Sequence, residues 1–161
     1  MSKKESPGSE DKPAKKDSEA SSSQQLYQQL LTCMRGTWRS LAVVPAQPGL
    51  SARLVADALV AVSGLVRGAA AKLFSAEGLE LAGASKVIVD MMTHVEAGGL
   101  AIVLLDSVVR KQSGIPIAMA ADASLLVVHL GLASTENAQK TVELLGRDKF
   151  IGAVTLEHER G

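Results

Sequence analysis

Short runs of consecutive apolar residues alternate, from residue 38 onward, with longer segments in which apolar residues recur every three or four positions. A short apolar run is typical of a strand that is buried on both faces of a parallel sheet, and the longer period is that of an amphipathic helix. The runs predict strands over residues 40–44, 71–76, 100–109, 124–131 and 150–159. The helical pattern predicts helices over residues 51–68, 78–99 and 134–146, with a loop and a helical turn over 113–123.

Strands that alternate with helices imply a mostly parallel sheet with both faces covered. Because crossover connections between parallel strands are right-handed, we expect an α/β fold, a three-layer αβα sandwich around five or more strands. In such a sheet, ligands bind beyond the carboxyl ends of the strands. This geometry predicts a candidate site at one edge, formed by the Pro45–Ser51 turn, Asp106 and the Gly131–Thr135 turn.

The helix predicted over residues 51–68 has one continuous apolar face, and Ser51 is placed to cap its first turn. The residues that share this face are Leu54, Val55, Ala58, Leu59, Val62, Leu65 and Val66.

The chain divides into a tail, a helix and a single α/β domain over residues 37–161. Residues 1–24 contain no Leu, Val, Ile or aromatic residue, and their five lysines balance five acids. With so little to bury, such a segment cannot offset the entropy of ordering, so we interpret it as a disordered polar tail, either solubilising, docking or phosphorylated. Apolar residues at every fourth position predict an amphipathic helix over residues 25–36. It packs on its own domain or serves as a recognition helix for another chain.

Composition narrows the function classes. Lys plus Arg (17) equal Asp plus Glu (17), so no global field favours nucleic acid or an anionic membrane. The single cysteine, Cys33, excludes an internal disulfide and suits a reducing compartment. The first residues form no secretory signal, and no uncharged apolar run reaches the roughly 18 residues that span a bilayer. We therefore expect a soluble, cytoplasmic protein. His94, His129 and His158 show no metal-ligand spacing.

The segment "LAVVPAQPGLSARL", residues 41–54, has the order of a phosphate loop, a strand followed by a turn and a helix. A phosphate loop needs several glycines, a lysine for the β- and γ-phosphates and a Ser or Thr hydroxyl for Mg²⁺. This turn has one glycine, Gly49, and no lysine.

Three segments nevertheless carry a resemblance. The loop resembles A-x-P-G-x-G-K-[ST]-T through Ala46, Pro48 and Gly49, "AIVLLDSVV" resembles hhhhDxPP, and "ADASLLVVHLGLAST" resembles ADGVLLVVRxGxT. The chain over roughly residues 38–156 thus resembles the deviant P-loop ATPases of the partition (MinD) type. It is most like the cytoplasmic domain of the bacterial tyrosine kinases of polysaccharide export. The resemblance implies a P-loop NTPase-like fold and a bacterial source.

At the diagnostic positions the sequence departs from this family. Ser51 takes the place of the second loop glycine, Ala52 that of the lysine and Arg53 that of the magnesium-binding Ser or Thr. Leu156 replaces the base-reading asparagine, and the only tyrosine is Tyr27, so the tyrosine-rich tail of the kinases is missing. We therefore interpret six residues as relics of a nucleotide site: Pro48, Gly49, Ser51, Ala52, Arg53 and Asp106.

Two roles are possible for each of three charged residues. In the family, Asp106 would hold Mg²⁺ through water; alternatively its carboxylate accepts backbone N–H groups of the neighbouring turns. Arg53 contacts an anion or lies on the surface. Glu77 is the remnant of a second acidic site or an ordinary loop carboxylate. We expect no catalytic residue, no metal ligand and no cofactor.

The resemblance implies a non-catalytic pseudo-ATPase that acts as a regulatory or scaffolding interaction protein. Its protein partner, in a homo- or hetero-oligomer, would be an active paralogue, a polysaccharide-export component or part of a cell-organising system. The alternative is a nucleotide-binding ATPase or kinase-like enzyme with a remodelled loop, in which Arg53 replaces the lysine and Asp106 holds Mg²⁺ for ATP. A third possibility is an unrelated α/β function, because doubly wound sheets host many activities.

Overall fold

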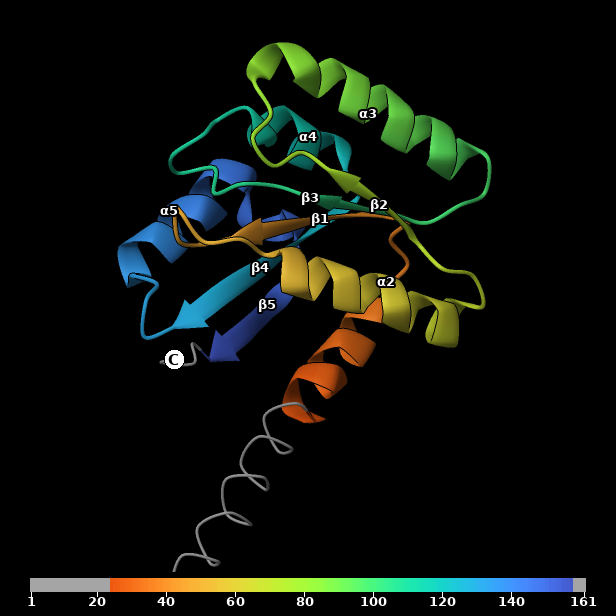
Figure 1. Ribbon diagram of the computed structural model, residues 1–161, viewed down its shortest axis with the longest axis horizontal. Coiled ribbons are helices and arrows are strands. Elements are labelled where there is room, and N and C mark those ends of the chain that lie inside the picture. The colour runs from red at the N-terminus through yellow and green to blue at the C-terminus, as the bar shows by residue number, and fades with distance from the viewer. Residues whose placement is uncertain (1–23, 158–161) are drawn as a thin grey trace, which may run out of the picture.

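A five-stranded, all-parallel sheet forms the centre of the molecule in the computed structural model, which describes residues 24–157 (Figure 1). The strands are β1 (Ser40–Pro45), β2 (Lys72–Ser75), β3 (Ala101–Leu104), β4 (Ala123–Leu130) and β5 (Phe150–Glu157). Their spatial order is β2-β3-β1-β4-β5. The predicted α/β fold class is therefore confirmed. Residues 1–23 of the predicted tail, and residues 158 and 159 of the last predicted strand, lie outside the described residues.

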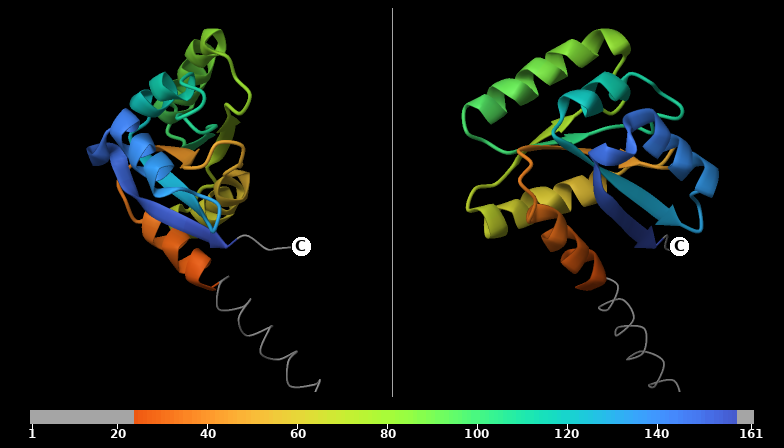
Figure 2. Two further views of the ribbon diagram at one scale, coloured as in Figure 1. Left: turned by 90° about the vertical axis from the view of Figure 1, so that its left-hand side faces the viewer. Right: turned by 180° about the vertical axis from the view of Figure 1, so that it is seen from behind.

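Helices cover both faces of this sheet and make the predicted three layers (Figures 1 and 2). The named helices are α2 (Arg53–Arg67), α3 (Leu81–Glu96), α4 (Gly114–Ala120), α5 (Thr135–Leu145) and a short 3₁₀ helix η1 (Arg147–Lys149). Residues 24–34 are helical as well. This N-terminal helix and α2 lie on one face, whereas α3, α4 and α5 lie on the other. Right-handed crossovers produce this arrangement, because only the connection from β1 to β2 runs toward the β2 edge.

Two apolar cores result, one on each face of the sheet. Successive residues of β1 alternate between them: Leu41 and Val43 join the first core with α2, and Ala42 and Val44 join the second with α3 and α4. All four side chains are fully buried. This is why the central strands read as continuous apolar runs and not as an alternating pattern.

The N-terminal helix packs on its own domain, which was one of the two roles expected for it. Leu30 and Met34, four residues apart, are buried in the first core. Their burial against the sheet is the main attachment of this helix.

Arg67, at the end of α2, also holds the last turn of the N-terminal helix. Its guanidinium donates to the carbonyls of Met34 (2.9 Å), Trp38 (2.9 Å) and Gly36, and it lies 4.7 Å from the centre of the Trp38 ring. These bonds satisfy carbonyls at the end of a helix and its following turn, which have no intrahelical partner. Burial, and then the nearby charge of Arg39, lowers the pKa of Arg67.

The third strand is shorter than predicted, and the apolar face of α2 is only partly buried. The third strand ends at Leu104 and not at residue 109, because the chain turns after Leu105: the Ser107 carbonyl accepts the Lys111 N–H at 3.0 Å, and Val108 is buried in the second core. On α2, Leu54, Leu65 and Val66 are 64%, 74% and 41% exposed and do not join the core. The apolar stripe of α2 is wider than the area that the sheet and the N-terminal helix cover.

Candidate functional site

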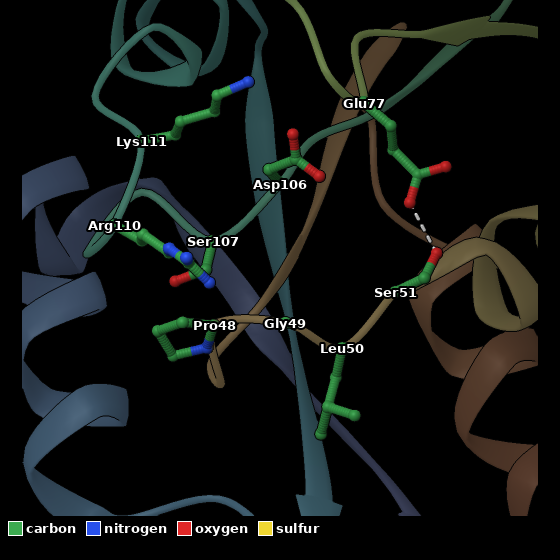
Figure 3. A pocket seen from close by; sticks show the side chains of 9 residues that line it. All are labelled: Pro48, Gly49, Leu50, Ser51, Glu77, Asp106, Ser107, Arg110 and Lys111. Carbon is green, nitrogen blue, oxygen red and sulfur yellow. Dashed lines mark hydrogen bonds between the residues drawn. The ribbon is translucent and has the colours of Figure 1, made fainter.

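A cavity of about 430 Å³ opens at the carboxyl ends of β1, β2 and β3 (Figure 3). Its walls come from the three loops that follow these strands: Pro48, Gly49, Leu50, Ser51, Glu77, Asp106, Ser107, Arg110 and Lys111. The chain leaves β1 toward α2 on one face and leaves β3 toward α4 on the other. Loops that diverge from neighbouring parallel strands leave a crevice between them, which is the usual ligand position in such sheets.

The loop between β1 and α2 is held closely to the sheet. Ala46 donates its N–H to the Val127 carbonyl at 2.9 Å, and Gly49 has a φ of 85°. A positive φ of this size favours glycine, because a Cβ would clash with the backbone. Of the expected site residues, Pro48, Gly49 and Ser51 thus lie on one wall of the cavity together.

Gln47 ties this loop to the start of α5. Its side-chain oxygen accepts the Ser134 N–H at 3.3 Å and the Asn137 amide at 3.2 Å. Ser134 is the N-cap of α5 and accepts the Asn137 N–H, as its sequence predicts. The Gly131–Thr135 turn therefore meets the β1–α2 loop through Gln47, a residue that sequence reasoning missed because it falls on the unspecified position of the A-x-P-G pattern.

Ala52 is fully buried and belongs to the first core. In the resemblance to P-loop ATPases this is the position of the lysine. Here the methyl group packs inward and does not line the cavity. Ala52 is also the N-cap of α2 and gives that helix no side-chain cap. The Ser51 hydroxyl compensates in part by accepting the Arg53 N–H at 3.1 Å.

Arg53 points toward the loop after β2. Its guanidinium lies 3.3 Å from Glu77 Oε1 and donates to the Ser75 hydroxyl at 3.2 Å. Glu77 Oε2 in turn accepts the Ser51 hydroxyl at 2.5 Å (Figure 3). Glu77 therefore holds Arg53, the first residue of α2, and Ser51, two residues before it, so the Arg53 guanidinium is directed at a carboxylate.

Asp106 follows β3 and accepts the Gly78 N–H at 2.7 Å through its Oδ2. Gly78 has a φ of 72°, so the turn after β2 is tight. This is the backbone contact that was one of the two interpretations of Asp106. The carboxylate thereby joins the loops that follow β2 and β3.

Three polar lining residues were not among the sequence candidates. Arg110 and Lys111 follow the Asp106 strand end, and Lys111 is 3.7 Å from Glu80. Arg110 has no hydrogen-bond or ion-pair partner within residues 24–157. Ser107 is 4% exposed, and its hydroxyl has no partner within the same residues. In the sequence Arg110 and Lys111 appear only as two adjacent cations beyond an apolar strand, which does not set Arg110 apart from other cations.

The remaining candidates lie elsewhere. Leu156 is paired in register with His129 on β4 and packs against the first core. His94 meets the Phe74 ring edge-on at 5.9 Å. Across residues 24–157, no three His, Cys, Asp or Glu side chains are grouped to hold a metal ion. None of the helices in this range is long and apolar enough to cross a bilayer.

Comparison with protein-family models, with curated proteins and with solved structures found no match to this chain.

Proposed function

We propose that this protein is a non-catalytic pseudo-ATPase that acts as a regulatory or scaffolding interaction protein. The observation that carries the proposal is the state of the β1–α2 loop. Ala52 is buried where the resemblance expects a lysine, and Arg53 pairs with Glu77 at 3.3 Å. The loop therefore directs no cation at the position of a β- or γ-phosphate, and such a cation supplies much of the rate enhancement in phosphoryl transfer.

The two carboxylates that line the cavity support the same proposal. Glu77 and Asp106 are both lining residues with carboxylate side chains. A nucleoside triphosphate brings about four negative charges, and phosphates placed beside the β1–α2 loop would lie near these carboxylates, whereas the lining cations Arg110 and Lys111 lie on the β3–α4 side. The rigid sheet and tied loops would then serve as a platform for a protein partner. In keeping with the resemblance, that partner would be an active paralogue, an envelope polysaccharide-export component or a cell-organising protein.

Calorimetric titration of MgATP and MgADP into the full chain, with light scattering for mass, tests the proposal. We expect no saturable heat and no nucleotide-dependent change in mass. Saturable binding at micromolar concentration would overturn it. If that binding were lost in Arg53→Ala and Asp106→Ala variants that keep the wild-type circular dichroism, the enzyme with a remodelled loop would be the better description.

A further inference from the structure

We propose that the β3–α4 side of the cavity is a binding site for a small molecule that carries a single oxyanion group, a carboxylate or a phosphate. Ser107 and Arg110 form this site, and Lys111 adds a second positive charge at its rim. The site goes beyond the proposed function because it uses none of the positions at which the resemblance expects nucleotide contacts.

Arg110 carries the attraction for an anion. Its guanidinium lines the cavity and has no partner within residues 24–157, whereas the other lining charges are engaged. Glu77 pairs with Arg53, Asp106 accepts the Gly78 N–H, and Lys111 lies 3.7 Å from Glu80. A guanidinium matches the geometry of a carboxylate or a phosphate and can donate two parallel hydrogen bonds to it.

Ser107 is the second, independent observation. Its side chain is buried, lines the same cavity and lacks a hydrogen-bond partner within the described residues. Buried hydroxyl groups in proteins are nearly always hydrogen-bonded, so an unpartnered one at a cavity wall indicates a missing acceptor. Figure 3 draws this hydroxyl on the same side of the cavity as the Arg110 guanidinium. An oxyanion between the two would accept from both.

The opposite wall limits the ligand to one anionic group. Glu77 and Ser51 lie across the cavity from Arg110 and Lys111, with Asp106 between them (Figure 3). A second anionic group on the ligand would approach these carboxylates. A cavity of about 430 Å³ is within the usual size range for small-molecule sites and leaves room for a neutral or cationic remainder.

The test is a titration of the isotope-labelled full chain, followed by amide chemical shifts. Inorganic phosphate and acetate are the two probes, and sodium chloride at equal ionic strength is the control. We expect saturable shifts in residues 107–111 with phosphate, acetate or both, and none with chloride. Binding by phosphate alone identifies a phosphate ligand, and stronger binding by acetate identifies a carboxylate.

Variants locate the site. Arg110→Gln removes the unpaired cation and should weaken binding by about tenfold or more. Arg147→Gln is the matched control, because Arg147 is exposed in η1 at the opposite edge of the sheet, and it should bind as the wild type does. Ser107→Ala should weaken binding by roughly threefold without unfolding the chain. Absence of saturable shifts with both probes would overturn the proposal, as would unchanged affinity in Arg110→Gln.

This outcome is separable from that of the proposed function. Failure of phosphate and acetate to bind overturns the oxyanion site and leaves the pseudo-ATPase proposal standing. Micromolar MgATP binding that depends on Arg53 overturns the pseudo-ATPase proposal, whereas the effect of Arg110→Gln on phosphate and acetate decides the oxyanion site.

Discussion

Arg53 and Glu77 face each other across the gap between the start of α2 and the end of β2, with 3.3 Å between the guanidinium and the carboxylate. The pair links two loops that parallel-sheet proteins commonly use to bind ligands. It also keeps the Arg53 guanidinium at the start of α2 on an anionic partner from the chain itself, and Arg53 is not among the residues that line the cavity.

The Arg53–Glu77 pair should nevertheless contribute little to stability. The Arg53 side chain is 48% exposed, and ion pairs at such positions contribute at most about 1 kcal/mol. We expect Arg53→Gln and Glu77→Gln each to change the free energy of unfolding by less than about 1 kcal/mol. Urea denaturation of the singles and the double gives the coupling energy, and the Lys86–Asp90 pair (2.9 Å) serves as a matched exposed control. A coupling well above that of the control would show that the pair is a structural element.

Asp106 should matter more for stability, because its carboxylate accepts the Gly78 N–H at 2.7 Å. Asp106→Ala leaves that N–H without its acceptor and should cost about 1–2 kcal/mol of unfolding free energy. Asp106→Asn should cost less, since an amide oxygen can still accept. Urea denaturation measures both, with exposed Asp57→Asn on α2 as the control. Equal stability of Asp106→Ala and wild type would contradict the structural role.

Removal of the Arg67 guanidinium should loosen the N-terminal helix. Arg67→Ala loses three bonds to backbone carbonyls and the contact with Trp38, and we expect a loss of about 2 kcal/mol. The free energy of unfolding of Arg67→Lys should lie between those of the wild type and Arg67→Ala, because an ammonium cannot reproduce the planar fork of the guanidinium.

Tryptophan fluorescence can follow the effect of the Arg67 substitutions. Trp38 is the single tryptophan, so its fluorescence during urea denaturation reports on the surroundings of the guanidinium. Exposed Arg35→Ala is the control for charge alone. An unchanged Trp38 spectrum in Arg67→Ala would show that the contact is not maintained in solution.

The fold was predictable because the central strands are apolar on both faces. β1 and β4 are buried between two helical layers, so their sequences read as strands without knowledge of their partners. The end of β3 was not predictable in the same way. Val108 is apolar but belongs to a turn that folds back into the second core, and apolar character alone cannot separate a strand from such a turn.

The location of the candidate site was predictable from the sequence, but the arrangement of its side chains was not. Parallel strands put Gly49 and Asp106 at one edge, and the structure has both at the cavity. The direction of each side chain was not predictable: Ala52 turns into the core, and Arg53 turns to Glu77. Arg110 could not be separated from any other cation by its sequence position, because its lack of a partner depends on where three loops converge.

Cys33 gives a prediction that depends on pH. The thiol is partly buried beside the first core, and this burial raises its pKa above the ordinary value of 9.0. A raised pKa means that the folded chain favours the neutral thiol more than the unfolded chain does. The thiol therefore contributes stability that is fully present below pH 9.0 and is lost as the pH rises through the higher folded value.

Thiol reactivity provides the measurement. Because the thiolate is the nucleophile, Cys33 of the folded chain should react with a disulfide reagent more slowly at pH 8 than the same thiol in urea. The free energy of unfolding of the wild type should also fall more steeply above pH 9 than that of Cys33→Ser, which lacks the titrating thiol. Comparing the two proteins at each pH removes the contribution of lysines and Tyr27, which they share. Equal reaction rates in the folded and unfolded chain, or parallel stability curves, would show that the thiol is accessible to water.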